Sequence, residues 1–194
     1  MVQIKVDIAA RKNYGNRRKT KDIKYLVIHY TGNDGDSAKG NANYFKTHIV
    51  EASAHYFVDD NGIIQSVPDD FAAYSVGGRK YPSCGKTGGG RFYGKCTNEN
   101  SINVELCDTR KNGKFDFSEE TLDNAADLCR VLLKKYNISV DNIIRHFDVV
   151  GKNCPAPFVS DGKAWEAFQE RIVDEVKYYE EMKDVPKWAQ PMVQ

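Results

Sequence analysis

Three side chains suited to binding a transition metal stand far apart in the sequence. His29 ends an apolar run, His146 follows another, and Cys154 comes eight residues after His146. Gly151 allows the chain to return between His146 and Cys154, and Pro155 keeps it from coiling into a helix. Imidazole nitrogen and thiolate sulfur are donors that zinc prefers, and three protein ligands leave one tetrahedral position open, as in catalytic sites. Taken singly, a histidine more commonly fills a surface or core position.

Two charged residues could complete such a site. Residues 101–107 alternate, so that Ile102 and Val104 face one way and Glu105 the other. Glu105 is either a solvent-facing strand residue or, if that face is the floor of a cleft, a group that accepts a proton from water. Lys152, two residues before Cys154, would bring a positive charge to the same space and could hold a developing oxyanion.

The elements that must position these residues alternate between strands and helices. Two segments beyond the alternating one indicate helices, because Ser118 and Asp161 each precede an apolar stripe of helical spacing. An Asp-Asp-Asn-Gly turn predicts a β-hairpin. The expected elements are strands at 25–30, 54–58, 63–67, 101–107 and 143–144, with helices at 38–49, from 118 and from 161. The pattern predicts an α/β fold with a mixed central β-sheet flanked by helices.

The chain is expected to hold one catalytic domain with two flanking segments. Residues 1–22 contain most of a basic cluster and are predicted to form an N-terminal arm, either solvated or in contact with an anionic polymer. Residues 23–180 form the domain, and 181–194 are a tail or the start of a further module. The glycine-rich stretch 77–100 predicts a long loop with a functional or mobile role.

Composition excludes several classes of protein. The 28 basic and 27 acidic residues give a net charge of +1, which does not fit a bulk electrostatic binder of nucleic acid. No apolar run is long enough for membrane insertion, and the N-terminus lacks the apolar core of a signal peptide. A monomer is the default expectation. Five cysteines leave at least one outside any intrachain disulfide, and Cys84 and Cys96 could bridge or stay free.

Four segments in order resemble one family. Residues 28–32 (IHYTG), 54–60 (AHYFVDD), 100–105 (NSINVE) and 145–155 (RHFDVVGKNCP) are similar to motifs of the type 2 zinc N-acetylmuramoyl-L-alanine amidases. That family includes phage endolysins and shares its fold with the peptidoglycan recognition proteins. The resemblance covers about residues 23–178. It implies a mixed sheet with a zinc site in a groove on one sheet face, and hydrolysis of the amide that joins N-acetylmuramic acid to L-alanine.

The resemblance also assigns roles to individual positions. It implies that Zn²⁺ is held by His29, His146 and Cys154, with Glu105 and Lys152 as catalytic residues. His55 stands where some members place a tyrosine beside the zinc, which suggests a site-lining role or a packing role. Three further residues are candidates for lining the site and contacting glycan or stem peptide: Tyr30, Tyr74 and Arg79. Asp148 could orient His146 or act in a turn or cap.

The predicted partner is therefore peptidoglycan, and the predicted place of action is the bacterial cell wall. Without a signal peptide in these residues, either secretion by another route or release by a phage is expected, and endolysin and autolysin both remain open. Two other functions stay in view. One is a non-catalytic wall-binding module, and the other is a zinc peptidase that cuts within the stem peptide.

Overall fold

A six-stranded mixed sheet forms the centre of the molecule. The computed structural model describes residues 3–183, with side chains up to residue 173. The strand order is β1-β5-β4-β7-β3-β10, and of these neighbours only β4 and β5 run antiparallel. The strands are β1 (Ile4–Val6), β3 (Tyr25–Tyr30), β4 (Tyr56–Asp59), β5 (Gly62–Gln65), β7 (Ser101–Leu106) and β10 (Ile143–Arg145). The prediction of a mixed central sheet is confirmed.

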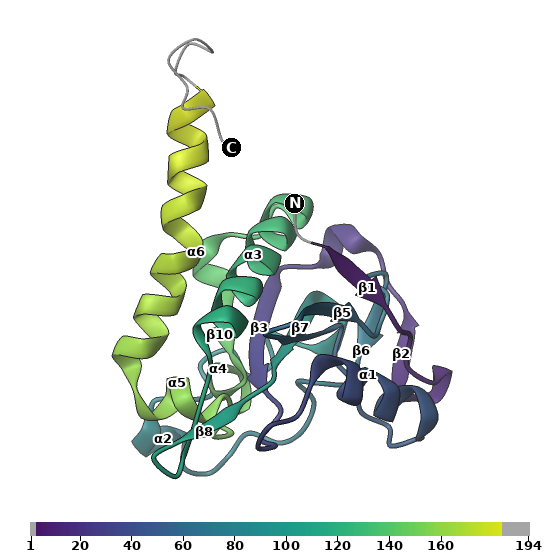
Figure 1. Ribbon diagram of the computed structural model, residues 1–194. Coiled ribbons are helices and arrows are strands. Elements are labelled where there is room, and N and C mark those ends of the chain that lie inside the picture. Colours follow the sequence, from purple (N-terminus) through teal and green to yellow (C-terminus); the bar gives the residue numbers. More distant parts are fainter. Residues whose placement is uncertain (1–2, 184–194) are drawn as a thin grey trace.

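Helices and short strand pairs surround this sheet. The helices are α1 (Ala38–Thr47), α2 (Cys84–Thr87), α3 (Glu119–Tyr136), α4 (His146–Val150), α5 (Ala156–Ser160) and α6 (Gly162–Lys183). Two further pairs are β2 (Tyr14–Arg17) with β6 (Phe71–Ala73), and β8 (Thr109–Lys111) with β9 (Lys114–Asp116). Short 3-10 turns lie at Arg11–Asn13, Thr20–Asp22, Asn98–Asn100 and Val140–Asn142. The long helices α3 and α6 lie side by side next to the sheet (Figure 1).

The two faces of the sheet differ in what covers them. Leu26 and Ile28 of β3 and Ile102 of β7 point into the main core, which α3 and α6 cover. Helix α3 begins where Ser118 accepts a hydrogen bond from the backbone N–H of Thr121, as the sequence predicts. The opposite face presents the other residues of the same strands. Because side chains alternate along a strand, this second face is available for a site.

The first 22 residues are part of the folded body. Strand β1 pairs with β5, and β2 pairs with β6. Asn13 is fully buried and donates to the carbonyls of Phe45 and His48, at 2.6 and 2.7 Å. Arg18 donates to the backbone carbonyls of Asp69, Asn98 and Ser101 at 2.7–3.0 Å. The prediction of a separate solvated arm is therefore wrong for the described residues, because these hydrogen bonds tie the segment to distant parts of the chain.

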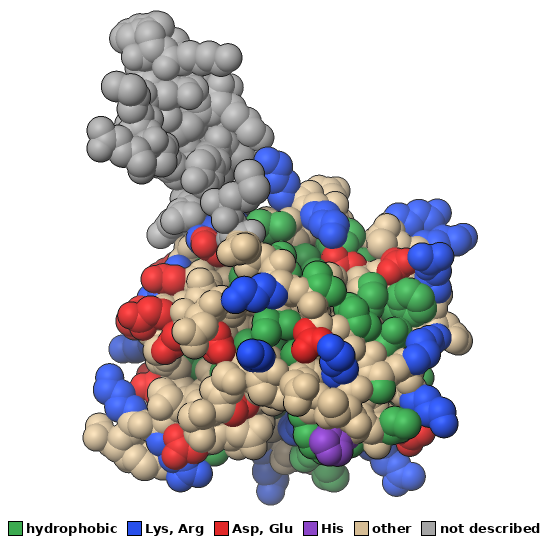
Figure 2. Space-filling view, turned by 45° about the vertical axis from the view of Figure 1, so that its right-hand side comes forward, with side chains coloured by type: hydrophobic (Ala, Val, Ile, Leu, Met, Phe, Trp, Pro, Cys, Tyr) green, Lys and Arg blue, Asp and Glu red, His purple; other side chains and the backbone are tan. Residues whose placement is uncertain are grey.

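Exposed basic side chains do remain on the surface. In the view of Figure 2, Lys and Arg side chains are scattered over the face and its edges rather than gathered into one patch. This distribution is in keeping with the near-neutral charge of the chain. None of the helices in the described part of the chain is long and apolar enough to cross a bilayer.

The glycine-rich stretch 77–100 contains more order than the sequence predicts. Helix α2 and a 3-10 turn interrupt it. Cys84 and Cys96 are both buried and both free, so they do not form the bridge that their spacing allowed. The Cys84 thiol instead lies 3.4 Å from the carbonyl oxygen of Val150, which packs α2 against the end of α4. Of the expected tail, residues 181–183 belong to α6, and residues 184–194 lie outside the described residues.

Candidate metal centre and active site

His29, His146 and Cys154 come together at one end of the sheet. Strand β10 lies parallel to β3 with Arg145 opposite Ile28, so the next residues, His146 and His29, meet at the same edge. The ligand atoms of the three side chains all lie within 4.8 Å of one another. The His29 Nδ1 to Cys154 Sγ distance is 3.8 Å, and the two imidazole centroids are 4.6 Å apart.

The loop between His146 and Cys154 makes this convergence possible. Gly151 ends α4 with a φ of 84°, a left-handed conformation that glycine adopts without strain. The chain then reverses, and the carbonyl oxygen of Cys154 accepts a hydrogen bond from the backbone N–H of Phe147 at 2.8 Å. The turn that the sequence predicted from Gly151 therefore returns the thiol to the first turn of α4.

The donor set fits a zinc ion. Two ligands of tetrahedral zinc, one nitrogen and one sulfur, lie about 3.6 Å apart at normal bond lengths, close to the 3.8 Å between His29 Nδ1 and Cys154 Sγ. Both ring nitrogens of His146 are buried, and neither has a hydrogen-bond partner in the residues that the structure describes. Such nitrogens are costly to bury unless something binds them. Three protein ligands also leave one corner of a tetrahedron free.

Burial sets the protonation states of these ligands. It lowers the pKa of His29 to about 4 and that of His146 to about 2, so both rings are neutral near pH 7 and keep a lone pair for a metal. Burial raises the pKa of the Cys154 thiol to about 12. A cation favours the thiolate, so metal binding at this site releases a proton.

Glu105 lies beside the metal ligands. It is the register partner of His29 across the β7–β3 pair, and its Oε1 is 3.8 Å from His29 Nδ1. Its Oε2 is buried and has no hydrogen-bond partner within the described part of the chain. Burial raises the pKa of Glu105 to about 8, an effect that the charge of Lys152 opposes. A carboxylate with this pKa can both accept and return a proton near neutral pH.

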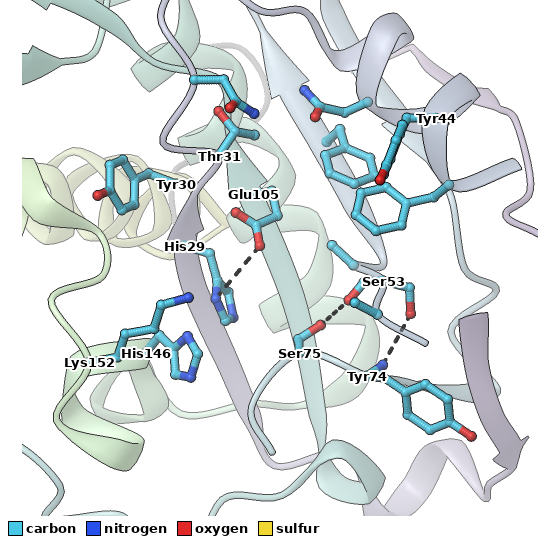
Figure 3. A pocket seen from close by; sticks show the side chains of 16 residues that line it. His29, Tyr30, Thr31, Tyr44, Ser53, Tyr74, Ser75, Glu105, His146 and Lys152 are labelled. Carbon is cyan, nitrogen blue, oxygen red and sulfur yellow. Dashed lines mark hydrogen bonds and ion pairs between the residues drawn. The ribbon is translucent and has the colours of Figure 1, made fainter. Parts of the chain in front are cut away.

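A cavity of about 650 Å³ opens onto these groups. In Figure 3, His146 and Lys152 lie on one side of it, Glu105 and His29 at its floor, and Tyr44 and Tyr74 on the far side. The predicted residues that line it are His29, Tyr30, Tyr74, Glu105, His146 and Lys152. Tyr44 and Tyr74 are 46% and 40% exposed, so their rings are available to a ligand.

Three candidates lie elsewhere. His55 is fully buried and does not line the cavity: its Nδ1 accepts from the backbone N–H of Asn103 at 3.0 Å, and its Nε2 is 3.1 Å from the carbonyl of Phe71. Arg79 is exposed and also lies outside the cavity lining. Asp148 accepts from the backbone N–H of Arg145 at 2.9 Å and pairs with its guanidinium, so it caps α4 instead of contacting His146.

Sequence reasoning missed Asn103. Its Oδ1 lies 3.0 Å from His29 Nε2, and it is fully buried. Asn103 is two residues before Glu105 in the alternating stretch and so shares its face, which is the available signal. Its partner could not be named without the pairing of β7 with β3.

Comparison with known proteins identifies the family. A profile described as N-acetylmuramoyl-L-alanine amidase matches residues 19–157, more than half of the chain. The chain belongs to this amidase family. A probable N-acetylmuramoyl-L-alanine amidase of Bacillus licheniformis is 38% identical over 156 residues, which cover 77% of this chain and 41% of that protein. The amidase BlyA of Bacillus subtilis is 35% identical over 160 residues, or 79% of this chain and 42% of that protein.

Solved structures of related proteins are similar in fold. The structure of PlyL has a TM-score of 0.68 at 30% identity and covers 88% of this chain and 97% of that chain. The catalytic domain of XlyA has a TM-score of 0.67 at 28% identity, with 88% and 99% covered. The chain thus spans well under half the length of the curated relatives above, and nearly all of these two solved chains.

Proposed function

We propose that this chain is a zinc-dependent amidase that hydrolyses the bond between N-acetylmuramic acid and L-alanine in peptidoglycan. The observation that carries the proposal is the convergence of His29, His146 and Cys154 beside Glu105. Both histidines and Glu105 line a cavity that Lys152 also lines. Family membership supports the choice of bond, because the matching profile and the relatives BlyA and XlyA carry that amidase name.

The chemistry divides between the ion and the side chains. A zinc ion held by the three ligands supplies Lewis acidity for an amide carbonyl and for water. Glu105, whose Oε2 has no hydrogen-bond partner among the described residues, accepts a proton from the attacking water and returns it to the leaving nitrogen. Lys152 lines the same cavity and offers its ammonium group to the oxyanion that develops on the carbonyl oxygen.

The wall of the cavity opposite the metal ligands suits an extended polymer. Tyr44 and Tyr74 present exposed rings there, and Ser53 is held in place by hydrogen bonds with Tyr74 and Ser75 (Figure 3). Amphipathic aromatic rings bury the apolar faces of a ligand while leaving its polar groups accessible. We infer that glycan or stem peptide binds along this side of the cavity. The protein would then act at the bacterial cell wall.

The test is a digest of purified peptidoglycan analysed by mass spectrometry. The amidase reaction releases stem peptides with a free L-alanine amino group and leaves the lactyl carboxylate on the muramic acid. Glu105→Gln keeps the shape of the side chain but removes the base, and we expect a loss of about 10²- to 10⁴-fold in rate with zinc still bound. Glu99→Gln, on an exposed residue outside the cavity lining, is the matched control and should stay fully active.

Other outcomes point to other functions. Binding to peptidoglycan without release of amino groups would indicate a wall-binding module. Cleavage between later residues of the stem peptide would indicate a zinc peptidase. Full activity of Glu105→Gln would remove this residue from proton transfer, and hydrolysis that persists after removal of zinc by a chelator would exclude the metal mechanism.

A further inference from the structure

A directed row of hydrogen bonds runs from a backbone carbonyl to the metal ligand His29. The hydroxyl of Ser101 donates to the carbonyl oxygen of Thr97 at 2.7 Å. The amide Nδ2 of Asn103 donates to Ser101 Oγ at 3.1 Å. The amide Oδ1 of Asn103 then lies 3.0 Å from His29 Nε2. Ser101, Asn103 and His29 are all buried, with exposed fractions of 0–2%.

The first link fixes the direction of the whole row. A backbone carbonyl can only accept, so the single hydroxyl proton of Ser101 is used on Thr97, and Ser101 Oγ must accept from Asn103. The amide of Asn103 therefore presents its nitrogen to Ser101 and its oxygen to His29. Because that oxygen only accepts, His29 must carry its ring proton on Nε2.

This choice of tautomer leaves the other nitrogen free on the correct side. His29 Nδ1 is the atom 3.8 Å from Cys154 Sγ and 3.8 Å from Glu105 Oε1, and so it faces the candidate metal centre. A metal ligand needs an unprotonated nitrogen. The opposite tautomer would put a proton where the metal bond must form.

The backbone of Asn103 is itself held firmly. Its N–H donates to His55 Nδ1 and its carbonyl accepts from the backbone N–H of His55, both at 3.0 Å. His146 contrasts with this arrangement, since neither of its ring nitrogens has a hydrogen-bond partner among the described residues. The protein thus orients one of the two histidine ligands in advance.

We propose that Asn103, with its amide directed by Ser101, is a positioning residue that selects the metal-binding tautomer of His29. Hydrogen bonds of this kind from a ligating histidine to a second residue fix the ring and strengthen metal binding. The inference rests on the proposed function in one respect, namely that His29 is a zinc ligand. It goes beyond that function in assigning a role to a residue that does not touch metal or substrate.

The direct test leaves Asn103 unchanged. The ring nitrogens of the histidines are observed by ¹⁵N NMR in the zinc-free wild-type protein near neutral pH, with the His29 signals identified by their loss in His29→Gln. We expect a neutral ring protonated at Nε2. A ring protonated mainly at Nδ1, or an even mixture of the two tautomers, would overturn the proposal whatever the activity of the enzyme.

Zinc affinity gives the second test, measured by competition with a chelating dye. Asn103→Leu removes the acceptor, and we expect about 10- to 100-fold weaker zinc binding together with a mixture of His29 tautomers. Asn103→Asp keeps an acceptor oxygen opposite Nε2 and should recover both the tautomer and most of the affinity. If Asn103→Leu does not fold, the comparison of Asn103→Asp with Asn103→Ser, whose hydroxyl is too short to reach Nε2, takes its place.

A matched control separates positioning from loss of stability. Val104 is the next residue of β7, and its side chain points into the opposite core. Val104→Ala should lower the thermal stability and leave zinc affinity unchanged. Equal zinc affinity in Asn103→Leu and wild type would overturn the proposal while leaving the proposed amidase function intact. Failure of the wild-type chain to bind zinc would overturn both.

Discussion

Gly151 offers the sharpest test of how the loop to Cys154 is built. It is buried, its φ is 84°, and a Cβ added there would overlap the Sγ of Cys84 and approach Tyr81. Gly151→Ala therefore carries two costs. The left-handed conformation costs a residue with a Cβ about 1–2 kcal/mol, and forcing an extra methyl group into packed surroundings costs about 1–3 kcal/mol. We expect a total loss of about 2–5 kcal/mol in the free energy of unfolding.

Gly94 provides the matched control for this prediction. Its φ is 74°, but a Cβ there would meet no atom of the described residues within 4 Å. Gly94→Ala should thus show the conformational cost alone, about 1–2 kcal/mol. Adding Cys84→Ala removes the atom that Gly151→Ala would overlap. In that background the cost of Gly151→Ala should fall toward that of Gly94→Ala, because only the 3.3 Å approach to Tyr81 Cβ is left.

The assay is equilibrium unfolding of the zinc-free protein in urea, with the three single variants and the double variant compared at equal m-values. Zinc binding by Gly151→Ala should also weaken, because the displaced loop carries Lys152 and Cys154. Two results would refute the reasoning. One is a Gly151→Ala cost equal to that of Gly94→Ala, and the other is no relief from Cys84→Ala.

Three further predictions concern side chains that can carry a charge: the buried His55, Arg18 of the N-terminal segment, and Lys152 in the cavity. Burial lowers the pKa of His55 to about 3, from 6.5 in the unfolded chain. Between pH 6.5 and 3 the unfolded state therefore binds a proton at His55 that the folded state does not bind. Stability should fall by up to about 1.4 kcal/mol per pH unit over that range, and urea titrations should show a shallower decline for His55→Gln. Arg18→Met should lower the free energy of unfolding by about 2–4 kcal/mol, because three backbone carbonyls lose their hydrogen-bond donor. Arg17→Met, at a side chain that is 74% exposed, should lower it by about 0–1 kcal/mol in the same urea assay. Equal losses would contradict the anchoring of the N-terminal segment. Lys152→Met should lower the rate of wall hydrolysis about 10²- to 10³-fold without loss of zinc, and Lys95→Met, in an exposed loop position, should leave both unchanged.

Much of the secondary structure could be predicted because its signals are local. The apolar run at 25–30 forms β3 with the predicted limits, and the alternation at 101–107 forms β7. Ser118 and the stripe behind it specify α3, whose last turn is closed by Asn137 in a left-handed conformation. By contrast β1 and β2 were not predicted. Residues 2–8 around β1 do alternate between apolar and polar side chains, which was the available signal, whereas the four-residue β2 has no periodic pattern.

The three predicted metal ligands lie together in the structure, and their residue types are what made that prediction possible. Cysteine and histidine are common ligands of zinc, and Cys154 comes only eight residues after His146 in the sequence. These two facts indicated that the two side chains converge. His55 shows the opposite case. An imidazole can serve as ligand, catalyst or hydrogen-bond acceptor, and only its neighbours Arg18, Phe71 and Asn103 show that it is held inside the fold.

Residue identity and patterns a few residues long were enough to name the ligand types, the strand that carries His29 and the family that the chain resembles. Which residues meet depends on how distant segments pair in the fold. The parallel pairing of β3 with β7 joins segments about 75 residues apart, and it alone sets Glu105 opposite His29 and Asn103 within reach of its ring. The roles of Asn103 and Glu105 depend on this pairing and its register. No short stretch of sequence contains that information.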